Sequence, residues 1–172
     1  MAIRCVMFDF GNVIGIFKTD EWFSFLRNHR GNCLDPRETF GSLVGILNKF
    51  DLGQLSAPEF YQVFQDIYQL QGVAKDKFFN MLGSVLWIDW DMVEIRDWLK
   101  QRGIVTVLVS NMNPYHAWYI RRKYPSLMAK FDHEMISCEE GVAKPDPEAI
   151  IRPLDSLGFR AEETILIDDY NC

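Results

Sequence analysis

The stretch Arg4-Cys5-Val6-Met7-Phe8-Asp9-Phe10-Gly11-Asn12-Val13 sets the architecture that we expect for the whole chain. Its first half is a short apolar run, typical of a strand buried on both faces, and it ends at a carboxylate, Asp9. Two later runs have the same shape: residues 104–109 precede Ser110-Asn111, and residues 164–167 precede Asp168-Asp169. Open α/β sheets place their sites at the carboxyl ends of strands, so we expect these polar groups to converge.

Between the first and second of these strands the pattern becomes helical. Asp35-Pro36-Arg37-Glu38 and Ser56-Ala57-Pro58-Glu59 each combine a cap residue, a proline in the first turn and a glutamate at the third position. Apolar residues then recur at helical spacing. We therefore predict an all-helical insertion over residues 17–88 and an α/β core built from residues 1–16 and 89–172. The alternation of strands and helices after residue 90 favours a doubly wound parallel sheet.

Composition limits the class of protein without naming a function. The chain has 172 residues and a net charge of −6, with no basic stripe that would indicate nucleic acid. No apolar run approaches the ~20 residues of a membrane span, and the N-terminus has no signal-peptide pattern. Cys5, Cys33, Cys138 and Cys172 are scattered without Cys-x-x-Cys spacing, which favours reduced thiols and a cytoplasmic location over disulfides or zinc.

Four motifs now stand in order along the chain. They are Phe8-Asp9-Phe10-Gly11-Asn12-Val13, Val109-Ser110-Asn111, Gly141-Val142-Ala143-Lys144-Pro145-Asp146-Pro147 and Ile167-Asp168-Asp169. In order and spacing they resemble the four motifs of the haloacid dehalogenase superfamily. The insertion and the Lys-Pro-Asp-Pro stretch resemble its helical-cap subgroup. The form of the first motif is similar to a bacterial branch of α-D-glucose-1-phosphate phosphatases.

The resemblance implies a Mg²⁺-dependent phosphatase of a small phosphorylated metabolite, a sugar 1-phosphate among the options. Asp9 would be the nucleophile and a metal ligand, with the main-chain carbonyl of Gly11 and the pair Asp168-Asp169 completing the metal site; Asp169 is the first choice for direct contact. Ser110 and Asn111 would bind the phosphoryl oxygens. Lys144 would neutralise the developing charge and hold the aspartates in place. The protein is expected to be a monomer or homodimer.

One departure from the pattern concerns catalysis. Phosphatases of this superfamily usually carry a second aspartate two residues after the nucleophile, where this chain has Gly11. General acid–base help is commonly worth about 10²–10⁴ in rate. Either the substrate has a good leaving group, or another residue substitutes (His116, His29, Asp20 or Glu21), or the protein binds ligands without turnover.

Two other classes remain as alternatives to the phosphatase: a non-catalytic binding or scaffold protein, and a haloacid dehalogenase. Dehalogenases resemble the pattern Asp-x-Tyr-Gly-Thr at the first motif, and Gly11-Asn12-Val13 does not match it. Phosphorelay receiver domains are excluded by motif order, because there the aspartate pair precedes the lysine. Family members usually continue with a helix and a strand after the aspartate pair, so we expect the core to be truncated at Cys172.

Overall fold

The computed structural model describes residues 2–169, and its centre is a parallel sheet. The strands β1 (Cys5–Phe8), β4 (Val105–Ser110), β5 (His133–Ile136) and β6 (Thr164–Ile167) lie in the order β5-β4-β1-β6. Every pairing is parallel, and Cys5 of β1 is in register with Val105 of β4 and Thr164 of β6. The predicted α/β fold with a parallel sheet is thereby confirmed.

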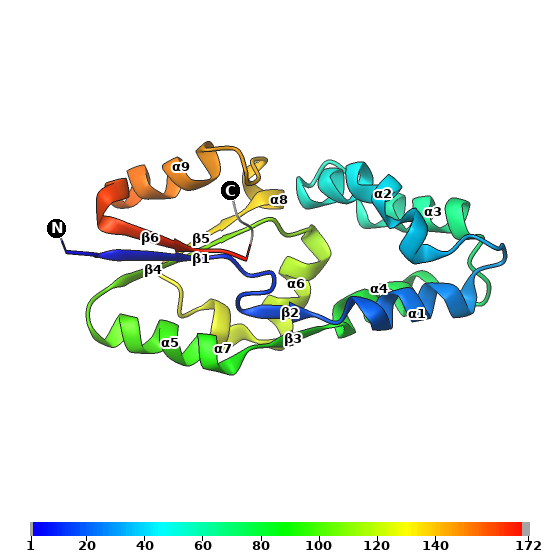
Figure 1. The fold of residues 1–172 in the computed structure, drawn as a ribbon, viewed down its shortest axis with the longest axis horizontal. Helices are drawn as coiled ribbons and strands as arrows, with labels where there is room; N and C mark the ends of the chain where they lie inside the picture. The colour runs from blue at the N-terminus through cyan, green and yellow to red at the C-terminus, as the bar shows by residue number, and fades with distance from the viewer. Residues whose placement is uncertain (1, 170–172) are drawn as a thin grey trace.

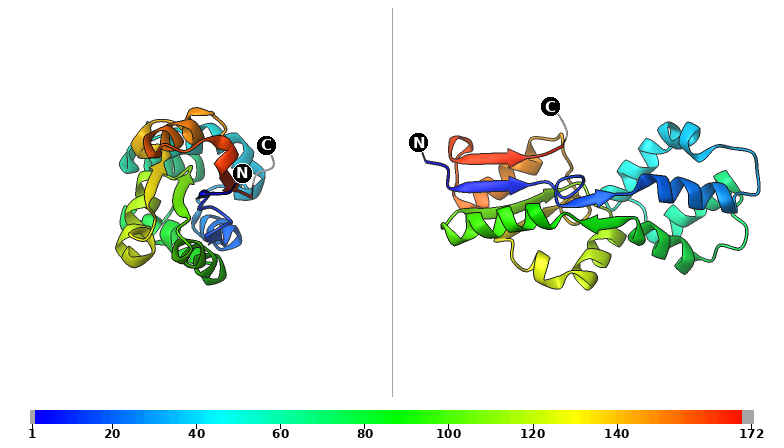
Figure 2. Two further views of the ribbon diagram at one scale, coloured as in Figure 1. Left: turned by 90° about the vertical axis from the view of Figure 1, so that its left-hand side faces the viewer. Right: turned by 60° about the horizontal axis from the view of Figure 1, so that its bottom comes forward.

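Helices cover both faces of this sheet (Figure 1). On one face lies α9 (Glu148–Leu157), and on the other lie α5 (Trp90–Gln101), α6 (Pro114–Lys123) and α7 (Pro125–Met128). Alternate residues of β1 pack into different clusters: Cys5 and Met7 face α9, whereas Val6 and Phe8 face the other layer. Figure 2 shows the sheet end-on between these layers. The helix α8 (Ser137–Glu140) and the 3-10 helix η1 (Ala161–Glu163) are short connections.

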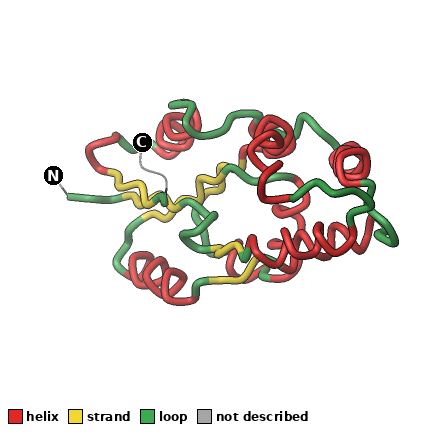
Figure 3. Tube along the Cα trace, turned by 45° about the vertical axis from the view of Figure 1, so that its right-hand side comes forward, coloured by secondary structure: helices red, strands yellow, loops and turns green. Residues whose placement is uncertain are grey.

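Besides α5, the segment between β1 and β4 contains four helices that lie beyond one end of the sheet (Figures 1 and 3). These are α1 (Thr19–His29), α2 (Pro36–Asp51), α3 (Ala57–Tyr68) and α4 (Lys75–Ser84). Both predicted helix starts are confirmed: Asp35 accepts a hydrogen bond from the Arg37 N–H, and Ser56 forms a capping box with Glu59. The helices share an aromatic-rich core of their own, which includes Trp22, Phe60 and Phe78.

Two short strands that the sequence did not indicate connect the helices to the sheet layer. The strands β2 (Gly15–Phe17) and β3 (Leu86–Ile88) pair antiparallel, with Phe17 opposite Leu86. The chain therefore enters and leaves the helical segment side by side. Within residues 2–169, no helix is both long and apolar enough to cross a membrane. Cys5, Cys33 and Cys138 are free thiols, and Cys172 lies outside the described residues.

Candidate active site

The carboxyl ends of β1, β4 and β6 bring most of the predicted site residues together. Asp9 directly follows β1 and is 7% exposed; Ser110 is the last residue of β4 and is 2% exposed. The Asp9 N–H donates to the Ile167 carbonyl at 2.9 Å, which fixes the end of β1 beside the end of β6. Asp168 and Asp169 come directly after β6. Parallel pairing thus places carboxylates that are about 160 positions apart in the sequence at one edge of the sheet.

Lys144 lies between two of these carboxylates. Its Nζ is 2.9 Å from Asp9 Oδ1 and 2.6 Å from Asp168 Oδ2, and all three side chains are largely buried. A buried ammonium group shared by two carboxylates compensates their charge and holds their orientation. Lys144 therefore contacts two of the three predicted aspartates, and its role in catalysis stays a prediction.

The side chain of Asn111 binds the backbone of Lys144. Asn111 Oδ1 accepts from the Lys144 N–H at 2.8 Å, and Asn111 Nδ2 donates to the Lys144 carbonyl at 2.8 Å. These two bonds anchor the loop that carries Lys144 to the end of β4. The sequence predicted Asn111 as a phosphate-binding residue, and this stays a prediction; the two bonds show that its side chain holds the loop that carries Lys144.

Three carboxylates form a cluster suited to a hard cation. One oxygen each from Asp9, Asp168 and Asp169 lies within 4.8 Å of the others. Carboxylate oxygens are the ligands that Mg²⁺ prefers, usually together with several waters. The donor set therefore fits the predicted metal. Gly11 lies in the turn beside Asp9, and its carbonyl remains a predicted ligand.

Asn12 is a site residue that sequence reasoning missed. Its Nδ2 donates to Asp169 Oδ2 at 3.0 Å, and its φ of +53° lies in the left-handed region. Asparagine tolerates this region better than most residues, so it can turn the chain and still present its amide. The sequence feature that could have indicated this role is the position of Asn12 next to Gly11 in the first motif.

Burial raises the pKa of the Asp9 carboxyl above its ordinary value. The charge of Lys144 and the hydrogen bonds from Lys144 and the Phe10 N–H act in the opposite direction, and the nearby Asp168 adds to the increase. Asp9 therefore needs positive charge close by in order to act as a carboxylate nucleophile.

The structure weighs against the residues suggested as substitutes for the missing acid. His116 is buried, its Nδ1 is 3.0 Å from Asn113 Nδ2 and its Nε2 is 3.1 Å from the Leu82 carbonyl. These partners hold a neutral ring, and burial lowers the pKa of His116 to about 4. His29 contacts the Phe25 carbonyl and Lys77 within the helical segment.

The two acidic candidates are engaged on the surface of the helical segment. Asp20 is ion-paired with Arg37, and Glu21 lies 3.7 Å from Lys18. The side chains of both acids are more than half exposed. Each of these carboxyl groups is therefore paired with a basic side chain of the same segment.

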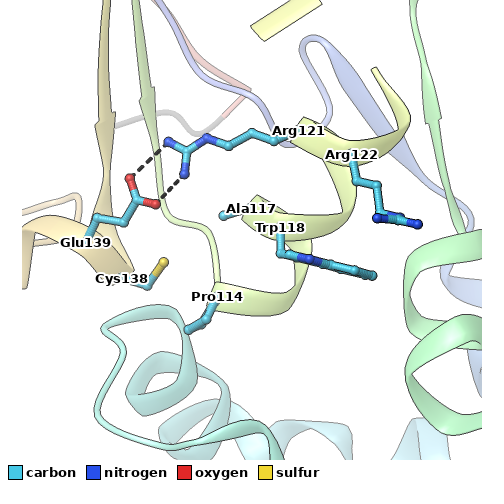
Figure 4. Close-up of a pocket in the computed structure, with 7 residues that line it drawn as sticks. All are labelled: Pro114, Ala117, Trp118, Arg121, Arg122, Cys138 and Glu139. Carbon is cyan, nitrogen blue, oxygen red and sulfur yellow. Dashed lines mark hydrogen bonds and ion pairs between the residues drawn. The ribbon is translucent and has the colours of Figure 1, made fainter. Parts of the chain in front are cut away.

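A surface pocket of about 550 Å³ lies between α6 and α8 (Figure 4). Arg121 spans it to Glu139, and Trp118 and Arg122 line its opposite side. None of the predicted site residues lines this pocket. The site at the strand ends is therefore separate from it.

Comparison with known proteins places the chain in a family. The model of the haloacid dehalogenase-like hydrolases matches residues 3–170. The chain belongs to the haloacid dehalogenase-like hydrolase family. The resemblance seen in the four motifs is confirmed.

Solved structures share the fold over nearly the whole chain. A HAD family enzyme from Bacteroides thetaiotaomicron, in complex with magnesium and inorganic phosphate, has a TM-score of 0.84 and 22% identity. That similarity covers 99% of this chain and 86% of the other. A predicted HAD-like family hydrolase from Porphyromonas gingivalis has a TM-score of 0.81 at 24% identity, covering 99% and 83% of the two chains.

A curated relative is similar over a shorter stretch. Glyceraldehyde 3-phosphate phosphatase from Pyrococcus furiosus is 33% identical over 73 residues. This stretch is 41% of the present chain and 29% of the relative. The match thus spans less than a third of the relative's length.

Proposed function

We propose that this protein is a Mg²⁺-dependent phosphatase of a small phosphorylated metabolite, acting through a phosphoaspartyl intermediate at Asp9. The observation that carries the proposal is the cluster of Asp9, Asp168 and Asp169 oxygens with the Lys144 ammonium group between Asp9 and Asp168. A phosphate monoester is an anion, and a carboxylate attacks it only where positive charge offsets the repulsion. The magnesium and phosphate in the Bacteroides enzyme and the activity named for the Pyrococcus relative support this reading.

The chain's own residues have distinct parts in the proposed reaction. Asp9 attacks phosphorus and receives the phosphoryl group, while Ser110 and the Asn111 N–H donate to the phosphoryl oxygens. Lys144 stabilises the negative charge and keeps Asp9 and Asp168 oriented. Mg²⁺, held by Asp9, the Gly11 carbonyl and the Asp168-Asp169 pair, would supply further charge neutralisation when bound.

We further propose that residues 17–88 form a cap over this site. Helices α1–α4 lie beyond the end of the sheet at which Asp9 lies, and they form a core separate from it. A cap in this place excludes bulk water and contributes to the choice of substrate. A sugar 1-phosphate is one substrate of the proposed class.

The deciding experiment measures phosphate release from sugar, acyl and aryl phosphates, with Mg²⁺ and after its removal by a chelator. Metal-dependent turnover is expected in the unchanged protein, and Asp9→Asn should reduce kcat by about 10³-fold or more. Asp155→Asn, an exposed aspartate on α9, is the matched control. Phosphate binding without turnover would instead support the non-catalytic alternative, and halide release from a haloacid would support the dehalogenase.

A further inference from the structure

Phe17 lies where the two hydrophobic cores of the molecule meet. It is the last residue of β2, it is half-buried, and its side chain packs against both the sheet cluster and the aromatic cluster of the helical segment. It is thus placed at the junction between the core and the proposed cap. A leaving group that departs from the side of the phosphoryl group away from Asp9 would pass this junction.

The ring of Phe17 also occupies the space beside Gly11. A Cβ atom on Gly11 would lie 3.5 Å from Phe17 Cε2 and 3.8 Å from Asp9 Oδ2. A side chain at position 11 would therefore point between the nucleophile and this ring. Of the residues that the structure describes, and leaving aside the chain neighbours of Gly11, Phe17 and Asp9 are the two with a side chain within 4 Å of the place where this Cβ would lie.

The ring is held from two sides. Phe17 pairs with Leu86 across the β2–β3 ladder, and the next residue donates its N–H to the Val85 carbonyl at 2.8 Å. The centroids of the Phe17 and His116 rings are 5.4 Å apart, and His116 is itself held by Asn113 and the Leu82 carbonyl. Phe17 is thus fixed by contacts with both clusters and forms one wall of this space.

An aromatic wall has a chemical consequence for phosphoryl transfer. When Asp9 forms its bond to phosphorus, the bond to the leaving oxygen breaks and that oxygen retains the electron pair. It needs a proton at once unless its charge is already stabilised, and a phenyl ring has no proton to donate. Water then attacks the phosphoaspartyl group, which regenerates the Asp9 carboxylate and releases inorganic phosphate.

Building on the proposed phosphatase function, we propose that Phe17 is a specificity-determining residue. By closing the space beside Gly11 with an apolar ring, it restricts turnover to phosphates of acidic hydroxyl groups. This class includes acyl phosphates and phosphates of acidic phenols. The hemiacetal oxygen of a sugar 1-phosphate is a better leaving group than a simple alcohol but a poorer one than phenol, so a sugar 1-phosphate belongs to the slow end of the range. Phosphates of simple alcohols are poor substrates because their leaving oxygen meets no proton donor.

The test is a series of aryl phosphates from strongly acidic nitrophenols to phenol, with acetyl phosphate and a simple alkyl phosphate added. The unchanged protein should show kcat/KM falling by about 10²-fold or more along the aryl series, the range that general acid catalysis would otherwise supply. Phe17→Leu, apolar and close in volume, should keep this dependence. Phe17→Gln, which brings an amide donor to the same place, should flatten it by about tenfold at the phenol end.

Thermal unfolding shows that each variant is folded before it is assayed. Phe17→Ala, which admits water in place of an amide, should flatten the dependence as well and replaces Phe17→Gln if that variant is unfolded. The role of Phe17 would be contradicted if kcat/KM depended on the acidity of the leaving group equally in all variants, or only weakly in the unchanged protein. An equal loss of rate in all variants, with the dependence unchanged, would show that the ring is only structural. Absence of turnover with every substrate would contradict the phosphatase itself, and this proposal with it.

Discussion

Lys144 is the side chain on which the charge balance of the site depends. Its ammonium group faces Asp9 and Asp168, while Asp169 lies within the same carboxylate cluster. Carboxylates this close repel one another, and the charge of Asp168 adds to the increase that burial causes in the pKa of Asp9. Lysine is suited to the role because its charge is compact and its stem reaches across the loop.

Replacing Lys144 with methionine should lower kcat by about 10²-fold or more, because the developing phosphoryl charge loses a stabilising group and Asp9 loses its partner. Metal-dependent phosphate release measures the effect. Lys130→Met is the matched control, since Lys130 is paired with Asp97 on the surface at 2.6 Å. Equal activity of the two variants would contradict the role assigned to Lys144.

Much of the site could be predicted from the sequence at the scale of residues. Asp9, Ser110, Lys144 and Asp168 are marked by their places after apolar runs or within a matching motif, and the fold brings them together. Asn12 and Phe17 were not predicted, because their contacts depend on the turn after β1. The dihedral angles of a turn decide which side chains meet, and a list of residue types does not contain them.

At the scale of elements, the turn between β1 and β2 has very little spare space. Gly15 opens β2, and a Cβ atom there would lie 2.1 Å from Phe10 Cε1 and 2.8 Å from Leu86 Cδ1. Both neighbouring side chains are 1% exposed, so neither can move into solvent. The close packing positions β2, and with it the residues that follow.

Gly15→Ala should therefore destabilise the fold by about 1–3 kcal/mol, the usual cost of overpacking a core. For a chain of this size, that corresponds to a fall in Tm of about 2–12 °C. Differential scanning calorimetry measures it. Gly45→Ala, on the exposed surface of α2 with no atom near the new methyl group, should instead be neutral or stabilising by up to about 1 kcal/mol. A Gly15→Ala protein as stable as the unchanged one would contradict this packing.

The capped helices and the apolar strands of the sheet could be predicted, whereas the two shortest strands could not. The caps at Asp35 and Ser56 gave correct starts for α2 and α3, because side-chain capping is a local effect that the sequence encodes directly. The strands β2 and β3 have three residues each, too few for any periodic pattern. They exist because residues 15–17 and 86–88 are brought together by the rest of the fold.

At the scale of the whole molecule, the helical segment also touches the sheet layer through the end of α2. The Ser137 hydroxyl donates to the Asp51 carbonyl and accepts from the Met112 N–H. Gly53, with φ of +68°, lies so close to Cys138 that a Cβ atom would be 2.6 Å from its carbonyl oxygen. Burial at this contact raises the pKa of the Asp51 carboxyl to about 7, although a hydrogen bond from Asn113 opposes the shift.

This contact should make stability depend on pH. Because the pKa of Asp51 is higher in the folded than in the unfolded state, its contribution is fully present below about pH 4. It is lost as the pH rises through about 7. The free energy of unfolding of Asp51→Asn, relative to that of the unchanged protein, should therefore increase by roughly 1–3 kcal/mol as the pH rises from 5 to 8. This figure is reduced to allow for the partial exposure of the carboxyl group. Urea unfolding at both pH values measures the gain, with Asp66→Asn on α3 as control. If the two proteins differed in free energy of unfolding by the same amount at both pH values, the assigned effect of Asp51 would be contradicted.

The pairing of β2 with β3 bears on how the chain finds its fold. Cys5 of β1 must meet Val105 of β4, and closing so long a loop costs entropy before any contact repays it. Phe17 and Leu86 lie side by side at the two ends of the helical segment. If the helices assemble first, from contacts near in sequence, this pairing shortens the loop that β1 and β4 have to close. The element that separates the two central strands in the sequence would then be the one that speeds their meeting.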